Sequence, residues 1–296
     1  MSTLGHEVDR IHVVCIADKR YGPYAGITLC SVLASNKNQH IHVHLFSDGI
    51  ARRDIDRTER MARHFNSDFS VYNIQEKLED IPGLPRSIHH YTRATFGRLF
   101  LPEFLSTEIK QAIYLDSDII CIASLHDLWT LGQGIKLLGA VRDIYADEDR
   151  EHKIALGMPA DHAYYNAGML VINVEEWRRQ NVGERILHFL SQQLKTKHGD
   201  QDVINAVFWE EITELPRRWN VLATSPNPDE LFAQLADAAN IHYAGAFKPW
   251  HFGYALCGRA GAGAFRHAKA ASPWRWMLPD LHFARIKRKI RAKIVK

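Results

Sequence analysis

Residues 11–17 read IHVVCIA, a short run of apolar and mostly β-branched side chains that ends at Asp18. A continuous run of this kind is typical of a buried strand in a parallel sheet. A Tyr21-Gly22-Pro23 turn and a helical stretch to about Ser35 follow, and residues 41–46, IHVHLF, form a second such run. The alternation of strand, helix and strand predicts an α/β fold with a wound, mostly parallel sheet flanked by helices.

The same alternation continues along the chain. We expect further strands over residues 69–72, 112–115, 119–122, 137–141, 166–174 and 241–243. We expect further helices over residues 52–65, 95–104, 174–177 and 183–195, and another that opens near residue 200. Residues 80–91 read as a loop, and the charged residues 144–163 read as a mobile flap. No internal repeat interrupts this order.

The composition is that of an ordinary globular protein. The chain has 296 residues, of which 46% are hydrophobic and 24% are charged, and this excludes disordered, collagen-like and coiled-coil proteins. The polar N-terminus does not resemble a signal peptide, and no apolar stretch is long enough to span a membrane. Four cysteines without a C-x-x-C pair predict small buried side chains and a reducing, cytoplasmic location: Cys15, Cys30, Cys121 and Cys257.

Positive charge gathers at the C-terminus. Residues 281–296 contain seven Lys and Arg and no acidic residue. The whole chain has a net charge of +3, so the residues before this segment carry a net negative charge. Four apolar residues recur in residues 281–296 at helical spacing: Phe283, Ile286, Ile290 and Ile294. This pattern predicts a basic amphipathic helix on an anionic membrane surface, with Trp274 and Trp276 as interfacial anchors. A basic tail that stays in solvent is the alternative. Nucleic acid is a further possible partner, but no feature of the sequence other than this basic charge favours it.

Acidic residues follow several predicted strands: Asp18, Asp48, Asp116 with Asp118, and Asp143. A single acid in this position is often a helix cap or a turn residue. Ligands of wound sheets bind outside the carboxyl ends of the strands, so repeated acids suggest a shared polar cleft.

Asp116 and Asp118 form the sharpest candidate site. Residues i and i+2 of an extended chain point the same way, and two adjacent carboxylates repel each other unless a cation lies between them. A hard divalent ion prefers such oxygen ligands, although a solvated turn is the other interpretation. His242, by itself more typical of a structural histidine, would give mixed nitrogen and oxygen ligation that favours Mn²⁺ over Mg²⁺.

Other residues could contribute to a ligand site beside these acids. Gly245 would permit close backbone approach, and Lys248 could meet a phosphate as a point charge. The amide of Asn166 could hold hydroxyl groups. Residues 200–202, DQD, open a predicted helix and are equally typical of a helix cap.

Six motifs occur in one order: IAD (16–18), RATFGRLFLPEFL (93–105), YLDSDII (114–120), YYNAGMLVINVEEWR (164–178), GDQDVIN (199–205) and HYAGAFKPWH (242–251). In combination, the sequence from about Ile11 to His251 resembles glycosyltransferase family 8. That family includes bacterial lipopolysaccharide α-galactosyl- and α-glucosyltransferases and the glycogenins. The resemblance implies a GT-A fold, with a catalytic domain over residues 1–255 and a C-terminal segment over residues 256–296.

The resemblance also implies a cofactor, a donor and site residues. Mn²⁺ is expected as the cofactor, and UDP-glucose or UDP-galactose as the donor, with transfer that retains the anomeric configuration. The expected metal ligands are Asp116, Asp118 and His242. The expected nucleotide contacts are Asp18, Tyr21, Gly245 and Lys248, and the expected sugar contacts are Arg98, Asn166, Asp200 and Gln201. His90 and Asp143 match positions near the acceptor.

The same positions bear on the mechanism. Gln201 occupies the place of a nucleophile beneath the sugar, but an amide is a poor nucleophile, and Asp200 and Asp143 are the nearby carboxylates. We therefore favour front-face substitution, in which the departing phosphate oxygen takes the acceptor proton. Arg20 stands where bacterial members often have Asn, and residues 144–163 match poorly, so the ribose contacts and the acceptor do not transfer.

Three other functions fit parts of the sequence. A D-x-D phosphohydrolase normally carries its motif after the first strand, not at residues 116–118. A non-catalytic sugar-binding protein would not need both acids, His242 and Lys248. A self-glucosylating, glycogenin-like enzyme is the nearest alternative. The basic tail favours a lipid-linked, lipopolysaccharide-type saccharide as acceptor, used at the inner face of the cytoplasmic membrane.

Overall fold

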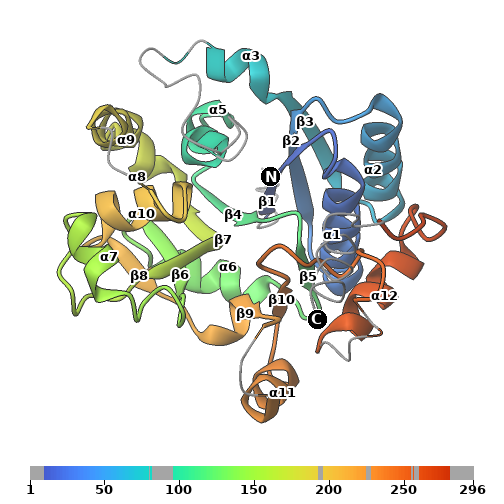
Figure 1. Cartoon of the computed structure of the whole chain (residues 1–296). Coiled ribbons are helices and arrows are strands. Elements are labelled where there is room, and N and C mark those ends of the chain that lie inside the picture. Colours follow the sequence, from blue (N-terminus) through green and yellow to red (C-terminus); the bar gives the residue numbers. More distant parts are fainter. Residues whose placement is uncertain are drawn as a thin grey trace, which may run out of the picture.

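A computed structural model describes residues 10–79, 81, 96–192, 196–224, 228–254, 256 and 260–280. Its centre is a seven-stranded sheet in the order β3-β2-β1-β4-β7-β6-β8 (Figure 1). The strands are β1 (Ile11–Asp18), β2 (Ile41–Asp48), β3 (Asp68–Asn73), β4 (Gln111–Leu115), β6 (Leu138–Arg142), β7 (Tyr165–Asn173) and β8 (Ile212–Glu214). Only β7 runs antiparallel to its neighbours β4 and β6, so the prediction of a mostly parallel α/β sheet is confirmed.

A second, three-stranded sheet positions the candidate site. Its order is β5 (Ile119–Cys121), β10 (Asn240–His242) and β9 (Val221–Leu222). Because β5 follows β4 after three residues, the two sheets meet at the segment 116–118. In the antiparallel pairing of β10 with β5, His242 lies opposite Ile119. The register therefore brings His242 beside the D-x-D motif.

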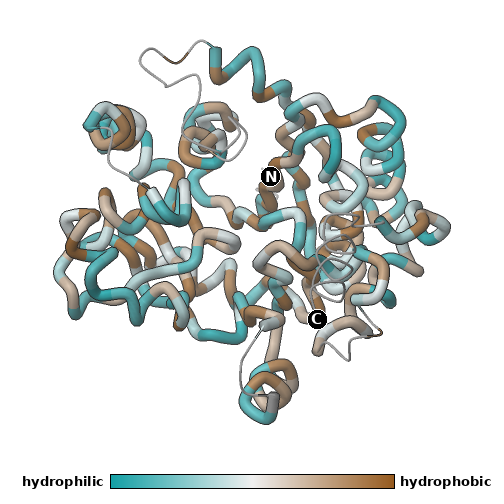
Figure 2. Tube along the Cα trace, in the orientation of Figure 1, coloured by the Kyte–Doolittle hydropathy of each residue, from teal (hydrophilic) through white to brown (hydrophobic). Residues whose placement is uncertain are grey.

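Helices cover both faces of the large sheet. On one side lie α1 (Gly22–Ser35), α2 (Arg52–His64) and α12 (Ala262–Ala271), at the right of Figure 1. On the other lie α3 (Ile74–Glu79), α5 (Leu101–Phe104), α8 (Val174–Arg179), α9 (Val182–Ser191) and α10 (Asp200–Phe208). Two large apolar cores fill the spaces on either side of the sheet, and Figure 2 shows the central strands as mostly hydrophobic.

The remaining elements are short. They are η1 (Arg98–Phe100), α6 (His126–Gly132), α7 (Arg150–Ala155), η2 (Arg217–Asn220) and α11 (Pro228–Ala236). In the part of the chain that the structure describes, no helix is both long and apolar enough to cross a bilayer.

The flap predicted over residues 144–163 is wrong in part, because this segment contains α7 and a small core of its own. Ala146, Leu156 and Met158 pack with Tyr164, and the buried Lys153 forms an ion pair with Asp147 at 3.1 Å. The charged side chains mask this core in the sequence. His90 lies outside the described residues, and so does the predicted loop over residues 80–91 except for Ile81.

Trp274 is not an interfacial anchor. It is 3% exposed, and its indole Nε1 donates a hydrogen bond to Oδ1 of Asp54 at 2.9 Å. Its ring packs so closely on Gly26 in α1 that a Cβ at that position would overlap it. Trp276 is 84% exposed, and residues 281–296 lie outside the described part. The boundary at residue 255 stays a prediction.

The prediction that the cysteines are small buried side chains is confirmed for three residues. Cys15, Cys30 and Cys121 are free and buried, while Cys257 lies outside the described residues.

Replacing Trp274 with alanine should destabilise the fold strongly. Trp274→Ala removes a buried ring from the core beneath α1 and leaves Asp54 without its indole donor, so the free energy of unfolding should fall by about 3–5 kcal/mol. Urea denaturation followed by circular dichroism measures this loss. Trp276→Ala, the exposed control, should change that free energy by less than about 0.5 kcal/mol. Similar small losses in both variants would contradict the packing described here.

Candidate active site

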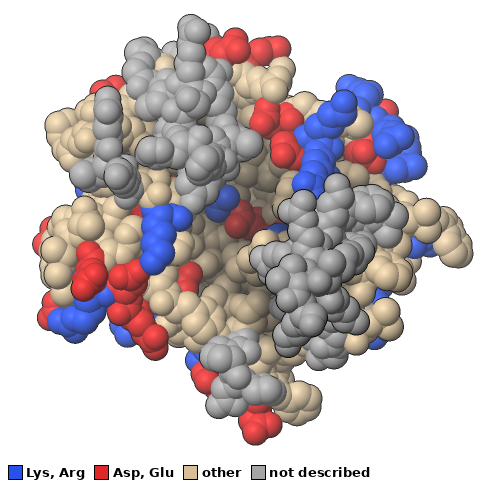
Figure 3. Space-filling view, viewed as in Figure 1, with Lys and Arg blue, Asp and Glu red and all other residues tan. Residues whose placement is uncertain are grey.

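The candidate site lies at the carboxyl ends of β1 and β4, where the small sheet meets the large one. Figure 3 shows this face hollowed at its centre, with acidic and basic side chains deep in the hollow. The sequence predicted a polar cleft at these strand ends, and most of the predicted site residues lie around it.

Asp116, Asp118 and His242 come together as a possible metal site. One ligand atom from each lies within 4.8 Å of the other two. Nε2 of His242 is 3.3 Å from Oδ1 of Asp118 and 3.9 Å from Oδ2 of Asp116. Two carboxylates and one imidazole make a mixed oxygen and nitrogen set, which suits Mn²⁺.

A chain of amides fixes the tautomer of His242. A carboxylate can only accept hydrogen bonds, so Oδ2 of Asp143 obliges Nδ2 of Asn166 to donate, at 3.0 Å. Oδ1 of Asn166 then accepts from Nδ2 of Asn220 at 2.8 Å, which leaves Oδ1 of Asn220 to accept from Nδ1 of His242 at 3.0 Å. Nδ1 of His242 therefore carries a proton, and Nε2 is the ring nitrogen that faces the two acids.

Lys248 forms an ion pair with Asp118, and its Nζ also donates to the carbonyl of Tyr243 at 3.0 Å. Burial alone would raise the pKa of Asp118, but Lys248 and His242 outweigh burial and lower that pKa well below its usual range. Burial opposes the charged form of Lys248, yet Asp118 raises its pKa above the ordinary value. Both members of the pair are therefore ionised at neutral pH.

Arg98 joins two acids of the site. Its Nη1 is 2.9 Å from Oδ1 of Asp116, and its Nε is 2.6 Å from Oδ2 of Asp200. Burial raises the pKa of Asp200 to about 6, because Arg98 offsets only part of the desolvation and Asp116 adds to it. Tyr114 donates to the same Oδ1 of Asp116 at 2.6 Å.

The side chain of Gln201 is held by its neighbours at both ends of the amide. Its Oε1 accepts from Nδ2 of Asn166 and from the backbone N–H of Ala167, each at 3.1 Å. Its Nε2 donates to Oδ2 of Asp143, also at 3.1 Å. Gln201, Asn166 and Asp143 thus form one network beside the possible metal ligands.

Asp18 and Tyr21 lie at the end of β1. One carboxylate oxygen of Asp18 accepts from the backbone N–H groups of Arg20 and Tyr21 at 2.8 and 2.7 Å, so Asp18 closes the turn into α1. Tyr21 contacts Trp250 edge to face, and burial raises its pKa, an effect that the nearby Lys248 partly offsets.

Gly245 adopts a φ of +91° in the loop between His242 and Lys248. Glycine adopts this conformation without strain, so the loop can turn back toward the end of β1.

Sequence reasoning missed three residues that support the site. Tyr114 was detectable, because it precedes Asp116 by two residues and shares its face of the strand. Asn220 ends the short helix η2, where no periodic pattern marks it. Gly168 leaves the space that the ring of His242 fills, since a Cβ there would overlap Cε1 and lie 2.7 Å from Nδ1.

Comparisons with known proteins identify the family of this chain. The model of a family described as glycosyl transferase family 8 matches residues 12–253. A lipopolysaccharide 1,2-glucosyltransferase of Escherichia coli is 28% identical, over 87% of this chain and 77% of that protein. A lipopolysaccharide 1,3-galactosyltransferase of Salmonella typhimurium is 26% identical, over 90% of this chain and 80% of that protein.

Solved structures show the same fold. The galactosyltransferase LgtC, in complex with donor and acceptor sugar analogues, superposes with a TM-score of 0.73 at 27% identity, covering 89% of this chain and 96% of LgtC. The bifunctional glycosyltransferase WbbM superposes with a TM-score of 0.79 at 23% identity. The match covers 92% of this chain but 52% of WbbM, so this chain corresponds to about half of that protein.

Proposed function

This chain belongs to glycosyl transferase family 8, and we propose that it transfers glucose or galactose from a UDP-sugar to a glycan with retention of configuration. The observation that carries the proposal is the cluster of Asp116, Asp118 and His242 with Lys248 at its edge. Glucosyl- and galactosyltransferases among the relatives, and sugar analogues bound to LgtC, support a hexose donor.

The residues of the cluster fit a divalent cation such as Mn²⁺. The amide chain described above engages Nδ1 of His242 and leaves Nε2 as the nitrogen available to an ion, and both acids are close enough to share that ion. A cation bound there would neutralise charge on the departing diphosphate. Lys248, already ionised beside Asp118, would meet a phosphate oxygen as a second positive charge.

The network around Gln201 supports front-face substitution. A double displacement needs a nucleophile beneath the sugar, and an amide is a poor one. The two nearby carboxylates are already engaged: Asp200 pairs with Arg98, and each oxygen of Asp143 accepts two hydrogen bonds. We propose that Gln201 and Asn166 orient the sugar while the departing phosphate oxygen takes the acceptor proton. A glycosyl adduct trapped on Asp200 or Asp143 of the wild-type chain would contradict this mechanism.

The acceptor follows from the relatives and from the tail. We propose a lipid-linked, lipopolysaccharide-type saccharide, because two relatives act on lipopolysaccharide and residues 281–296 are strongly basic. The enzyme would then work at the inner face of the cytoplasmic membrane, bound through this tail.

Deleting residues 281–296 should release the protein from anionic vesicles. Each basic residue near such a surface contributes about 1 kcal/mol of attraction, and the segment carries seven. Sedimentation with phosphatidylserine vesicles measures the loss, with phosphatidylcholine vesicles as the control surface. Hydrolysis of the donor should be unchanged, because no residue of the candidate site lies in the segment. Equal binding of the full and shortened chains would reject the membrane proposal.

Release of UDP tests the proposed reaction without knowledge of the acceptor. UDP-glucose, UDP-galactose and other UDP-sugars are incubated with the enzyme and Mn²⁺, and then with EDTA. We expect slow release from one UDP-hexose that EDTA abolishes. A ladder of added hexose masses on the enzyme would instead indicate a self-glucosylating enzyme. No release and no UDP binding would favour a sugar-binding protein that has lost catalysis.

A further inference from the structure

Three histidines gather at the end of the sheet opposite the candidate active site. His12 lies on β1, and His42 and His44 lie on β2, with His12 beside His42 and Val14 beside His44 in the register. Alternate residues of a strand share a face, so the three imidazoles project from one face of the two strands. Asp18 is six residues further along β1, about 20 Å away, so this cluster is separate from the site at Asp116.

The rings are close enough to share one ion. One ring nitrogen from each histidine lies within 4.8 Å of the other two. Nδ1 of His12 and Nε2 of His44 share a hydrogen bond at 2.9 Å, which a bound ion would replace. Zinc bound by imidazoles at about 2.0–2.1 Å in tetrahedral geometry separates its nitrogen ligands by about 3.3 Å. Small rotations of the rings would therefore suffice to admit the ion.

Neighbouring hydroxyl groups orient two of the rings from behind. Nδ1 of His44 is 3.0 Å from the hydroxyl of Tyr72, and Nε2 of His42 is 2.8 Å from Oγ of Ser70. Metal-binding histidines are characteristically held through their second nitrogen in this way. Nδ1 of His42 is buried and has no hydrogen-bond partner among the described residues, an arrangement that a bound ion would satisfy.

Arg10 lies beside His12 and His42, so its charge bears on whether the cluster can take a cation. The positive charge of Arg10 is compensated, because Asp68 lies 3.3 Å from its guanidinium.

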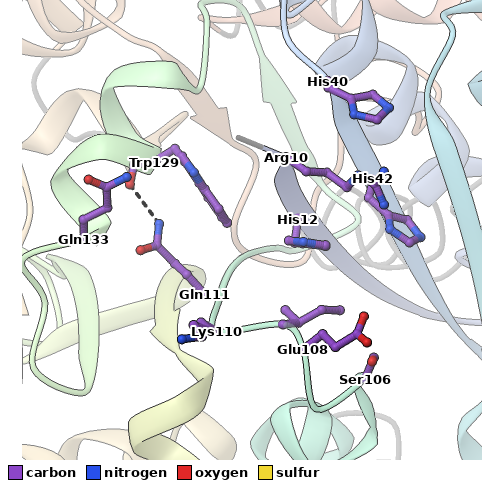
Figure 4. A pocket seen from close by; sticks show the side chains of 11 residues that line it. Arg10, His12, His40, His42, Ser106, Glu108, Lys110, Gln111, Trp129 and Gln133 are labelled. Carbon is purple, nitrogen blue, oxygen red and sulfur yellow. Dashed lines mark hydrogen bonds between the residues drawn. The ribbon is translucent and has the colours of Figure 1, made fainter. Parts of the chain in front are cut away.

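A cavity of about 700 Å³ opens onto the cluster (Figure 4). His12 and His42 lie on one wall, and Ser106, Glu108 and Lys110 from the segment that leads into β4 lie across from them. The cavity gives an ion a route from solvent and leaves room for a water or a small ligand on it.

We propose that His12, His42 and His44 form a second metal site, which takes Zn²⁺ or a similar nitrogen-preferring transition metal and keeps one coordination position open to the cavity. An all-imidazole set favours Zn²⁺ over Mn²⁺, whereas the carboxylate-rich site at Asp116 suits Mn²⁺. The ion would tie β1 to β2 and raise the thermal stability of the chain. This inference does not depend on the proposed transferase activity.

Zinc titration of the full chain, prepared without a histidine tag, tests the proposal. Mn²⁺ is kept in excess to occupy the Asp116 site, and ZnCl₂ is added in a calorimeter. We expect one equivalent of Zn²⁺ to bind and to raise the melting temperature. His12→Asn and His42→Asn should each weaken the affinity by about 100-fold or more, since losing even an outer partner of a metal ligand costs about 10–100-fold. Co²⁺ in place of Zn²⁺ should give a visible tetrahedral spectrum that both variants lose.

Two controls locate the ion. His126→Asn removes an exposed histidine at the start of α6, and Asp116→Asn removes a ligand of the other site; neither should change zinc affinity. The wild-type cobalt spectrum and melting temperature decide the matter even where a variant fails to fold. No zinc binding by the wild-type chain, full affinity in both histidine variants, or a loss confined to Asp116→Asn would each overturn the proposal.

Discussion

Asp116→Asn should lower the Mn²⁺-dependent rate of hexosyl transfer by about 10²–10³-fold while the chain stays folded. Asp116 faces His242 and receives hydrogen bonds from Tyr114 and Arg98. The amide keeps the size of the side chain and one acceptor oxygen, but it removes a negative charge from the metal site. Turnover of the identified UDP-hexose at saturating Mn²⁺ measures the effect, and circular dichroism checks the fold.

Asp127→Asn is the matched control, because Asp127 is an exposed acid in the first turn of α6, and this helix contacts Gln111 at the start of β4, not the end of β4 that leads to Asp116. That variant should keep the wild-type rate. Wild-type turnover by Asp116→Asn would show that the cluster is not the catalytic metal site.

Gly168→Ala should reduce Mn²⁺ affinity about tenfold or more, because the added methyl group would push the ring of His242 out of place. No metal-binding residue is itself replaced in this variant. The new methyl group would overlap Cε1 of His242 and lie 2.7 Å from its Nδ1. The ring cannot move away freely, because it is buried and held by Asn220. The strain should also lower the free energy of unfolding by about 1–3 kcal/mol.

Electron paramagnetic resonance of free Mn²⁺ measures the affinity, and urea denaturation measures the stability. Gly263→Ala is the control, since a Cβ at Gly263 meets nothing within 4 Å and the residue lies in the helix α12. That change should leave Mn²⁺ binding unaltered and should not destabilise the chain. Wild-type Mn²⁺ affinity in Gly168→Ala would contradict the role given to His242.

The central strands could be predicted because they carry continuous apolar runs such as IHVVCIA, which few other structures accommodate. Asp116 and Asp118 lie close together as predicted, but the reason given was wrong: residues 116–118 are not extended. They form a turn, closed by a hydrogen bond from the N–H of Ile119 to the carbonyl of Asp116 at 3.1 Å. The placement of His242 beside them does not follow from local sequence, because it depends on the pairing of β10 with β5, two strands of three residues each. Such short strands leave no periodic pattern, and here only the family resemblance pointed to the residue.

The errors have the same physical origin. Trp274 stands before a basic tail and reads as a membrane anchor, but it packs on Gly26 and Asp54, more than 200 residues earlier in the chain. Residues 144–163 read as an irregular flap, because Lys153, which the structure buries against Asp147, looks like a solvated charge. Burial decided by distant partners leaves no signal in a local window of sequence.

The coupling between Mn²⁺ and UDP is the most direct test that the Asp116, Asp118 and His242 cluster holds the metal for a UDP-sugar. Calorimetry measures the affinity of UDP for the wild-type chain in Mn²⁺ and in EDTA. The account predicts that Mn²⁺ strengthens UDP binding about tenfold or more, and that Asp116→Asn abolishes this gain. Equal affinity for UDP in Mn²⁺ and in EDTA would contradict it.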